Sequence, residues 1–162
     1  MLDSPPHRGH FERRGAPVTA FTRIDREYIL IRTGIYNPSH VIVLDPSLIG
    51  QIDPTQGLEK NGWLILNAPS SILDDRWGEE ANVAAVNASE IAVRHGLGTK
   101  TSPIVNTAIL GATLAVTKIL KIESLEQAIE KSVPERVKEN VAAARDAYRE
   151  VRMKNATASA RN

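Results

Sequence analysis

The chain has 162 residues, with 20 Lys and Arg against 19 Asp and Glu, so its formal net charge at pH 7 is +1. This length supports one domain with a substantial hydrophobic core, and the near-neutral charge gives no reason to expect nucleic acid as a partner. The absence of cysteine excludes disulfides, thiolate nucleophiles and cysteine-ligated iron–sulfur clusters within the chain. No stretch reaches the ~20 apolar residues of a membrane span, and the N-terminus has no apolar secretion signal. We therefore expect a cytoplasmic protein without a membrane partner.

Strands are the elements predicted first along the chain. Residues 18–24 and 28–33 are rich in β-branched and aromatic residues, and the charged connector between them is short enough for a hairpin, although it lacks Asn-Gly or Asp-Gly. Residues 40–45 (HVIVLD) form a continuous apolar run that ends in an acid, which is typical of a strand buried on both faces. Asp45 is placed to cap a short helix that begins with Pro46.

Two further strands follow the same pattern. Residues 62–67 (GWLILN) and 81–86 (ANVAAV) are apolar on both faces, so we expect them to be central, parallel neighbours of the HVIVLD strand. Asn87 and Glu90 have the spacing of a helix cap and predict a short helix over 89–95.

The C-terminal half is predicted to be helical. Helices are expected over residues 103–120, 125–132 and 134–154, the second capped by Ser124 and the third with apolar residues three to four apart. Gly111 weakens the first of these helices by about 1 kcal/mol unless a close neighbour compensates.

The alternation of strands and helices predicts an α/β fold, with a mostly parallel sheet in a three-layer α/β/α arrangement. We expect an irregular segment over residues 1–15, a single domain over 16–154 and a flexible tail over 155–162. These boundaries are inferred from the prolines near the N-terminus and from the small and polar residues of the tail.

Few residues of the chain have the arrangement of a catalytic or metal site. His7 and His10 lack a third ligand at a defined offset, which favours a solvated segment over a metal site. Asp45 and Asn67 follow strands, where ligand sites of α/β folds lie, but for Asp45 we favour the simpler interpretation that it caps the following helix. The pair Asp74-Asp75 is interpreted as a solvated polar loop rather than a cation site.

Nucleotide and nucleophile motifs are absent from the sequence. It contains no GxGxxG and no GxxxxGK[ST], and no serine within a nucleophile elbow. We therefore assign no catalytic residue and no metal ligand to this chain.

Two segments are unusual for their positions. Arg13, Arg14 and Gly15 precede the first predicted strand, where two guanidinium groups are able to bind a phosphate or carboxylate, to form ion pairs with a neighbouring subunit, or to remain solvated. Asn106 stands where a helix of small apolar residues begins, which capping explains, and that helix is expected to be buried.

These segments carry a resemblance to a known family. The motifs ERRGAPVTAFTRID (12–25), HVIVLD (40–45), PIVNTAILGA (103–112) and ESLEQAI (123–129) resemble, in order and spacing, the gamma subunit of 2-oxoacid:ferredoxin oxidoreductases. The pyruvate:ferredoxin oxidoreductase (pyruvate synthase) type is the most similar, because the ERRGAPV form favours pyruvate or branched-chain 2-oxoacids. Gamma chains of this family usually have a strand, a glycine loop and a helix before this motif. The resemblance therefore implies a Rossmann-like domain that lacks the first strand and the glycine loop.

The resemblance implies a subunit of a thiamine-diphosphate-dependent enzyme that makes acyl-CoA, CO2 and reduced ferredoxin from a 2-oxoacid. Thiamine diphosphate, Mg2+ and iron–sulfur clusters are then expected on alpha, beta and delta-type partner subunits, and none in this chain. Coenzyme A is the implied co-substrate, and Arg13, Arg14 and Gly15 are assigned to one of its phosphates or to a subunit interface. The chain is expected to be inactive alone.

A second interpretation comes from another class of protein. Without the glycine loop, the chain is also consistent with a truncated, non-catalytic α/β scaffold or binding module that has only an assembly role. Nucleic-acid binding by the C-terminal cations is disfavoured, because Asp146 and Glu150 alternate with them at helical spacing, as on a solvated helix face.

Overall fold

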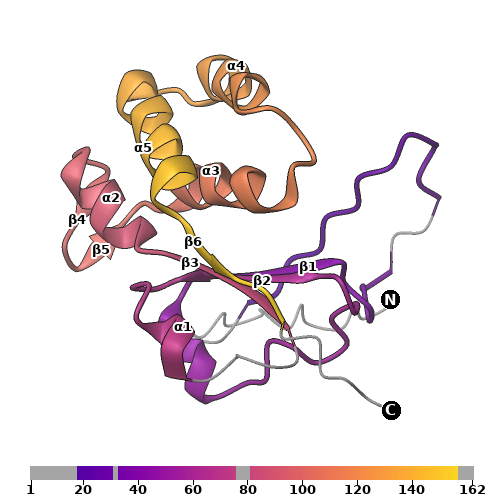
Figure 1. Ribbon diagram of the computed structural model, residues 1–162. Helices are drawn as coiled ribbons and strands as arrows, with labels where there is room; N and C mark the ends of the chain where they lie inside the picture. The colour runs from indigo at the N-terminus through magenta and orange to yellow at the C-terminus, as the bar shows by residue number, and fades with distance from the viewer. Residues whose placement is uncertain (1–17, 31–32, 76–80, 157–162) are drawn as a thin grey trace, which may run out of the picture. The chain divides into compact units, whose positions relative to one another are not determined.

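The computed structural model describes residues 18–30, 33–75 and 81–156. The chain divides into two compact units, residues 1–35 and 36–162. All regular secondary structure of the described residues belongs to the larger unit (Figure 1). No helix among the described residues is long and apolar enough to cross a membrane.

A four-stranded sheet forms the centre of the larger unit. Its spatial order is β1 (His40–Val43), β2 (Trp63–Asn67), β3 (Asn82–Val86) and β6 (Arg152–Lys154). The first three strands pair in parallel, and β6 pairs antiparallel with β3. The predicted α/β class with a mostly parallel sheet is thus confirmed, as is the parallel pairing of the three apolar strands.

β1 departs from the prediction of a central strand. It is the outer strand of the sheet in the described part of the chain, and its Ile42 side chain is 39% exposed. The apolar run was interpreted as burial on both faces, whereas only Val43 of this strand is buried. An apolar run alone does not distinguish a central strand from an edge strand.

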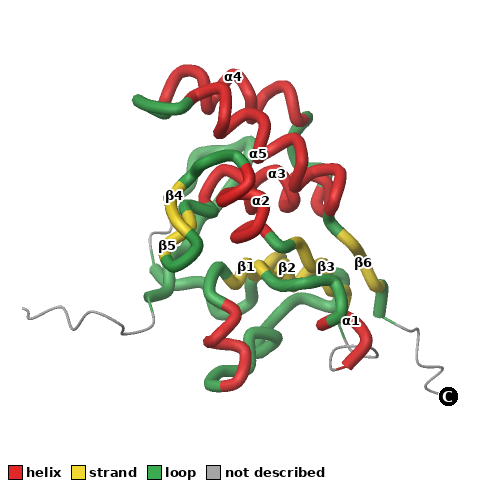
Figure 2. The backbone as a smooth tube through the Cα atoms, turned by 90° about the vertical axis from the view of Figure 1, so that its left-hand side faces the viewer, coloured by secondary structure: helices red, strands yellow, loops and turns green. Residues whose placement is uncertain are grey.

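The helices of the larger unit lie on both faces of the sheet. They are η1 (Pro46–Gly50), α1 (Ile72–Asp75), α2 (Ala88–Arg94), α3 (Asn106–Thr117), α4 (Ile122–Ser132) and α5 (Val137–Glu150). Figures 1 and 2 show α2, α3 and α5 on one face and α1 on the other, with α4 beyond α5 and farthest from the sheet. The three-layer arrangement is therefore present, with one layer made of short helices.

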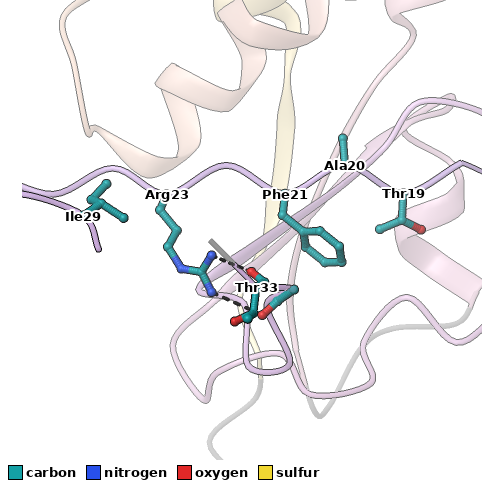
Figure 3. Close-up of a pocket in the computed structure, with 7 residues that line it drawn as sticks. Thr19, Ala20, Phe21, Arg23, Ile29 and Thr33 are labelled. Carbon is teal, nitrogen blue, oxygen red and sulfur yellow. Dashed lines mark hydrogen bonds between the residues drawn. The ribbon is translucent and has the colours of Figure 1, made fainter. Parts of the chain in front are cut away.

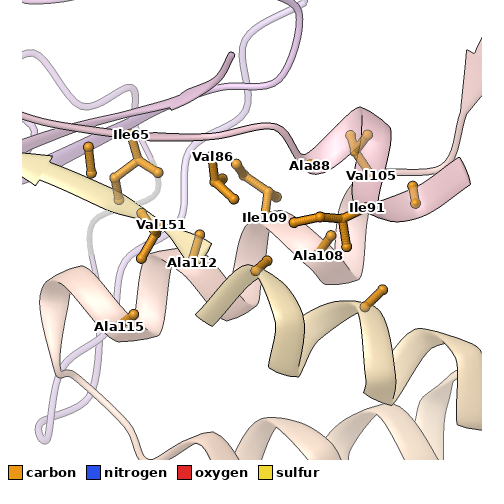
Figure 4. Packing of buried hydrophobic residues seen from close by; sticks show 14 of the residues in the cluster. Ile65, Val86, Ala88, Ile91, Val105, Ala108, Ile109, Ala112, Ala115 and Val151 are labelled. Carbon is orange, nitrogen blue, oxygen red and sulfur yellow. The ribbon is translucent and has the colours of Figure 1, made fainter. Parts of the chain in front are cut away.

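Strand alternation divides the core into two clusters. Ile65 on β2 and Val86 on β3 point toward the α2, α3 and α5 layer, as Figure 4 shows. Leu64 and Leu66 point to the opposite face, where they pack with Ile49 of η1. Because neighbouring side chains of a strand face opposite sides, the apolar runs of β2 and β3 contribute to both clusters.

α3 and α5 cross in close contact at Gly111. A Cβ atom at this position would lie 2.0 Å from the backbone oxygen of Ala144, which leaves no room for any side chain. A glycine inside a helix was expected to have a close neighbour that compensates for its low helix propensity. For Gly111, this neighbour is the backbone of α5.

Several element ends differ from the predictions. α3 begins only at Asn106, because Pro103 belongs to β5 (Ser102–Pro103), which pairs with β4 (Gly98–Thr99) in a short ribbon. α4 begins at Ile122, ahead of the predicted cap Ser124. Asp74 and Asp75 end a helical turn, α1, instead of lying in a loop.

The predicted helix over 134–154 is too long at both ends. α5 begins at Val137 and ends at Glu150, after which Arg152–Lys154 forms β6. The three residues of β6 do not form a pattern that predicts a strand. They adopt the extended conformation because they pair with the free edge of β3. Lys154 adds a side-chain bond from its Nζ to the backbone oxygen of Leu73, at 2.9 Å.

The described part of the smaller unit contains no strand, so the predicted hairpin over 18–33 is wrong. Its described residues form no backbone–backbone hydrogen bond with one another. The connector lacks the residues of a primed turn, which would align two limbs for a ladder. Instead, the Asp25 carboxylate accepts a hydrogen bond from the Glu27 N–H at 3.1 Å and forms an Asx turn.

Candidate functional site at the carboxyl edge of the sheet

The carboxyl ends of β1, β2 and β3 meet at one edge of the sheet, because the three strands are parallel. Ligand sites of open α/β sheets lie at such an edge. Asp45 and Asn67, which the sequence placed at strand ends, both belong to it, and Asn87 follows β3 there.

Asp45 serves as the N-cap of η1, as predicted. Its Oδ1 accepts a hydrogen bond from the Ser47 N–H at 2.9 Å, and Pro46 occupies the first turn. Hydrogen bonds from the side chain and the backbone of Ser47 lower the pKa of the Asp45 carboxyl below its ordinary value. The capping interpretation of this acid is confirmed.

Asn67 cross-links the carboxyl edge. Its side chain is buried, and its Nδ2 donates to the backbone oxygen of Leu44 at 2.8 Å and to Ser89 Oγ at 2.9 Å. Its Oδ1 accepts from the Ser89 N–H at 3.1 Å. Asn67 thus connects the end of β2 to the end of β1 and to the first turn of α2, and it acts as a positioning residue rather than a free ligand.

Asn87 and Glu90 form the predicted cap of α2. Asn87 Oδ1 accepts from the Glu90 N–H at 3.1 Å, and Asn87 Nδ2 donates to Glu90 Oε2 at 2.8 Å. The side chains of both residues therefore form hydrogen bonds at the start of α2 itself. Asn67 and Asn87 together fix α2 on the sheet.

Asn106 does not cap α3. It lies inside the helix, and the N-cap is Val105, which forms no side-chain cap hydrogen bond. The Asn106 side chain is exposed, while nearly all of the rest of α3 is buried, as the sequence predicted for this helix.

The predicted site residues Arg13, Arg14 and Gly15 lie outside the described residues, as do His7 and His10. Among the described residues, no group of three or more His, Cys, Asp or Glu is arranged to hold a metal ion. With no cysteine anywhere in the chain, it supplies no thiolate ligand for an iron–sulfur cluster.

Arg23 is a residue that sequence reasoning missed. Its guanidinium donates to the backbone oxygens of Thr33 at 2.7 Å and Gly34 at 3.2 Å, and so joins the two limbs of the smaller unit. Figure 3 shows this contact beside an open hollow of about 500 Å3 to which Thr19 and Phe21 also contribute. A lone arginine with backbone partners ten residues away has no sequence motif.

Contacts between helices were also missed. Thr107 donates to Asn140 Oδ1 at 2.8 Å in a buried contact that joins α3 to α5. His95 Nε2 lies 2.7 Å from Asp146 Oδ2, and this hydrogen bond lowers the pKa of the Asp146 carboxyl. The partners lie 33 and 51 residues apart, so local patterns carry no signal for them.

Comparison with known proteins matches residues 8–150 to the Pyruvate ferredoxin/flavodoxin oxidoreductase family. The chain belongs to this family. A Thermococcus litoralis protein named "Pyruvate/ketoisovalerate oxidoreductases common subunit gamma" is 48% identical over 141 residues, which are 85% of this chain and 74% of that protein. A Methanothermobacter thermautotrophicus protein named "Pyruvate synthase subunit PorC" is 42% identical over 141 residues, 86% of this chain and 74% of that protein.

A solved structure agrees with this assignment. The crystal structure of pyruvate oxidoreductase subunit PORC from Thermotoga maritima matches with a TM-score of 0.60 at 30% identity. The match covers 74% of this chain and 66% of that chain, just under two thirds. The resemblance to gamma subunits of 2-oxoacid oxidoreductases is thus confirmed, and the chain is of the gamma, or PorC, type.

Proposed function

We propose that this chain works as the gamma subunit of a multi-subunit, thiamine-diphosphate-dependent 2-oxoacid:ferredoxin oxidoreductase in the cytoplasm, with pyruvate as the substrate. The enzyme would form acyl-CoA, CO2 and reduced ferredoxin. The match of residues 8–150 to the oxidoreductase family is the observation that carries the proposal. Relatives at 42–48% identity are named as gamma or PorC subunits of pyruvate or ketoisovalerate enzymes.

The proposal assigns the cofactors to other subunits. Thiamine diphosphate stabilises the carbanion that forms when a 2-oxoacid loses CO2, and iron–sulfur clusters transfer single electrons. A chain without cysteine supplies no ligands of the kind that clusters take. We therefore place these groups and Mg2+ on alpha, beta and delta-type partners, with ferredoxin bound by the complex.

In this proposal the chain supplies no catalytic residue and instead holds binding groups in position. Residues 16–154 would act as one gamma-type domain, in which Asn67 holds the carboxyl edge of the sheet rigid. Arg13, Arg14 and Gly15 would contact a phosphate of coenzyme A or a neighbouring subunit, since guanidinium groups form bidentate contacts with phosphates and carboxylates.

A reconstitution experiment tests the proposal. The chain is co-expressed with the other subunits encoded by its host, and pyruvate-dependent, coenzyme A-dependent reduction of a viologen dye is measured with and without it. We expect the complete set to reduce the dye and the set lacking this chain to lose most of that activity. Equal activity without the chain would overturn the proposal.

A further inference from the structure

Asn61 and Gly62 form the one Asn-Gly pair in the sequence, at the point where the β1–β2 connection enters β2. In such a pair the backbone nitrogen of the glycine attacks the side-chain carbonyl carbon of the asparagine, and a glycine hinders this attack least. A bond forms between Gly62 N and Asn61 Cγ, and the side-chain nitrogen leaves as ammonia with the proton that Gly62 N loses. Water then opens the succinimide ring to aspartate or isoaspartate. Asn61 is exposed, so water and base reach it.

The fold itself requires the glycine of this pair. A Cβ atom at Gly62 would lie 2.4 Å from the backbone oxygen of Ser39 and 2.9 Å from that of Glu59, which is closer than a side chain tolerates. The backbone before β1 approaches Gly62 here, and only glycine fits beside it. An asparagine at position 61 therefore creates the reactive pair, whereas another polar residue at this exposed position would avoid it.

In the folded chain the attacking nitrogen is held by a hydrogen bond. The buried Gly62 donates its N–H to the backbone oxygen of Glu59 at 2.7 Å, and its carbonyl accepts from Asn82 Nδ2 at 3.1 Å. Attack on Asn61 needs the Gly62 nitrogen to lose its proton and to turn toward the Asn61 side chain, which breaks the bond to Glu59. The reaction therefore needs a local opening at the start of β2.

We propose that Asn61 is a site of spontaneous deamidation that the fold protects, so that modification occurs in chains in which the start of β2 has opened. The proposal does not depend on the enzymatic function proposed above. The rate in the folded chain is then the rate in the open chain multiplied by the small fraction of time for which this region is open.

The two products differ in their effect on the sheet. Aspartate keeps the normal backbone and adds one charge at an exposed position, which the fold accommodates. Isoaspartate routes the main chain through the former side chain and lengthens it by one carbon directly before Gly62. The Trp63 N–H donates to Ser39 O and to His40 Nδ1, both at 3.3 Å, and this lengthening displaces it from both acceptors. We expect isoaspartate, and not aspartate, to disrupt the pairing of β2 with β1.

Deamidation rates test the protection. The chain is kept at about pH 8 in buffer and in guanidinium chloride, and the peptide that contains Asn61 is followed by mass spectrometry. A synthetic peptide of residues 56–66 in both solutions gives the unprotected rate and the effect of the denaturant. We expect the unfolded chain to react as fast as the peptide, and the folded chain at least tenfold more slowly.

Asn106 is the matched control within the same chain, because it is exposed but is followed by threonine. In the unfolded chain it should react at least tenfold more slowly than Asn61. Equal rates at Asn61 in the folded and the unfolded chain overturn the protection, and equal rates at Asn61 and Asn106 in the unfolded chain overturn the choice of site.

Refolding tests the difference between the products. The chain modified in denaturant is returned to buffer, the folded fraction is separated by size-exclusion chromatography, and isoaspartate is labelled with an isoaspartyl methyltransferase. We expect isoaspartate to be at least tenfold depleted in the folded fraction relative to aspartate. Asn61→Asp should have the same urea midpoint as the unchanged chain, and Asn61→Ser should refold fully after the same treatment. Equal amounts of both products in the folded fraction, or an equal loss of refolding in Asn61→Ser, would overturn the assigned effect of isoaspartate.

Discussion

His40 is a side chain through which the stability of the sheet depends on pH. Its Nδ1 accepts a hydrogen bond from the Trp63 N–H at 3.3 Å, which requires the neutral ring. Burial lowers the pKa of His40 below its ordinary value of 6.5, and the charge of Glu59 opposes this only in part. The folded chain therefore binds a proton here less readily than the unfolded chain does.

We expect this residue to make the protein less stable in mild acid. Because the folded pKa is the lower one, its contribution is complete at about pH 7.5 and is lost as the pH falls from about 6.5 toward the folded pKa, with a slope of at most about 1.4 kcal/mol per pH unit. Urea unfolding of the full chain at pH 7.5 and 5.5 measures this loss. His40→Gln should reduce the difference between the two pH values, and an identical difference in the variant would contradict the assignment.

Arg13 and Arg14 carry the proposed contact with coenzyme A or with a neighbouring subunit. A solvated pair contributes little to folding, so we expect the double variant Arg13→Ala/Arg14→Ala to leave the melting temperature of the isolated chain nearly unchanged. In the complex, each lost charge-assisted contact costs about 1.5–3 kcal/mol, which corresponds to at least a tenfold effect.

The measurement separates the two roles of these arginines. A tenfold rise in the KM for coenzyme A with normal assembly indicates a phosphate contact, whereas tenfold weaker assembly indicates an interface. If neither quantity changes, the two arginines are ordinary surface residues and the assignment is wrong.

Polar side chains at helix ends could be predicted from sequence only where the motif is local. Asp45 and Asn87 each bond to backbone groups two or three residues away, so their sequence spacing already contains the contact. Asn106 has the same residue type at a similar position, yet it is the first residue of α3 and the N-cap is Val105. The ribbon of β4 and β5 sets where that helix starts, and a local pattern does not contain it.

Among the elements, the crossing of α3 and α5 has the least room. A Cβ at Gly111 would lie 2.0 Å from the Ala144 backbone oxygen, so Gly111→Ala must push the two helices apart. The cost of such overpacking is about 3 kcal/mol or more, against a gain of about 1 kcal/mol in helix propensity. We expect a net loss of about 2 kcal/mol or more in the free energy of unfolding, measured in urea.

Gly50→Ala is the matched control for this substitution. No heavy atom lies within 4 Å of a Cβ built at Gly50, so the same chemical change meets open space there. Its effect should lie between zero and a gain of about 1 kcal/mol. Equal effects of the two substitutions would show that α3 and α5 do not cross as closely as described.

β2 and β3 were predictable because burial on two faces leaves runs such as WLILN with almost no polar residue. The same signal wrongly made the edge strand β1 a central one. β6 was not predictable, since a three-residue strand of Arg, Met and Lys takes its conformation from β3 rather than from its own residues. The hairpin over 18–33 failed for the opposite reason. Its residues favour strands, but its described residues form no backbone–backbone hydrogen bond with one another, and propensity alone does not form a ladder.

At the scale of the whole molecule, the two edges of the described sheet differ in character. β6 is short and carries Arg152 and Lys154, which are features that discourage pairing with other chains. β1 at the other edge reads HVIV and has an exposed Ile42. Between these edges, a cluster of buried hydrophobic residues lies on each face of the sheet.

A hydrophobic core does not supply the chemistry of the proposed reaction, and we expect the isolated chain to be catalytically inactive. Loss of CO2 from pyruvate needs a group that stabilises the carbanion, and one-electron transfer needs a redox carrier. This chain has no cysteine, and its described residues form no metal-binding group. The purified chain with pyruvate, coenzyme A and thiamine diphosphate should reduce no viologen dye, whereas adding it to its partner subunits should restore activity in proportion to the complex formed. Dye reduction by the chain alone, at a rate that scales with its concentration and survives removal of trace partners, would contradict the assignment of the cofactors to other subunits.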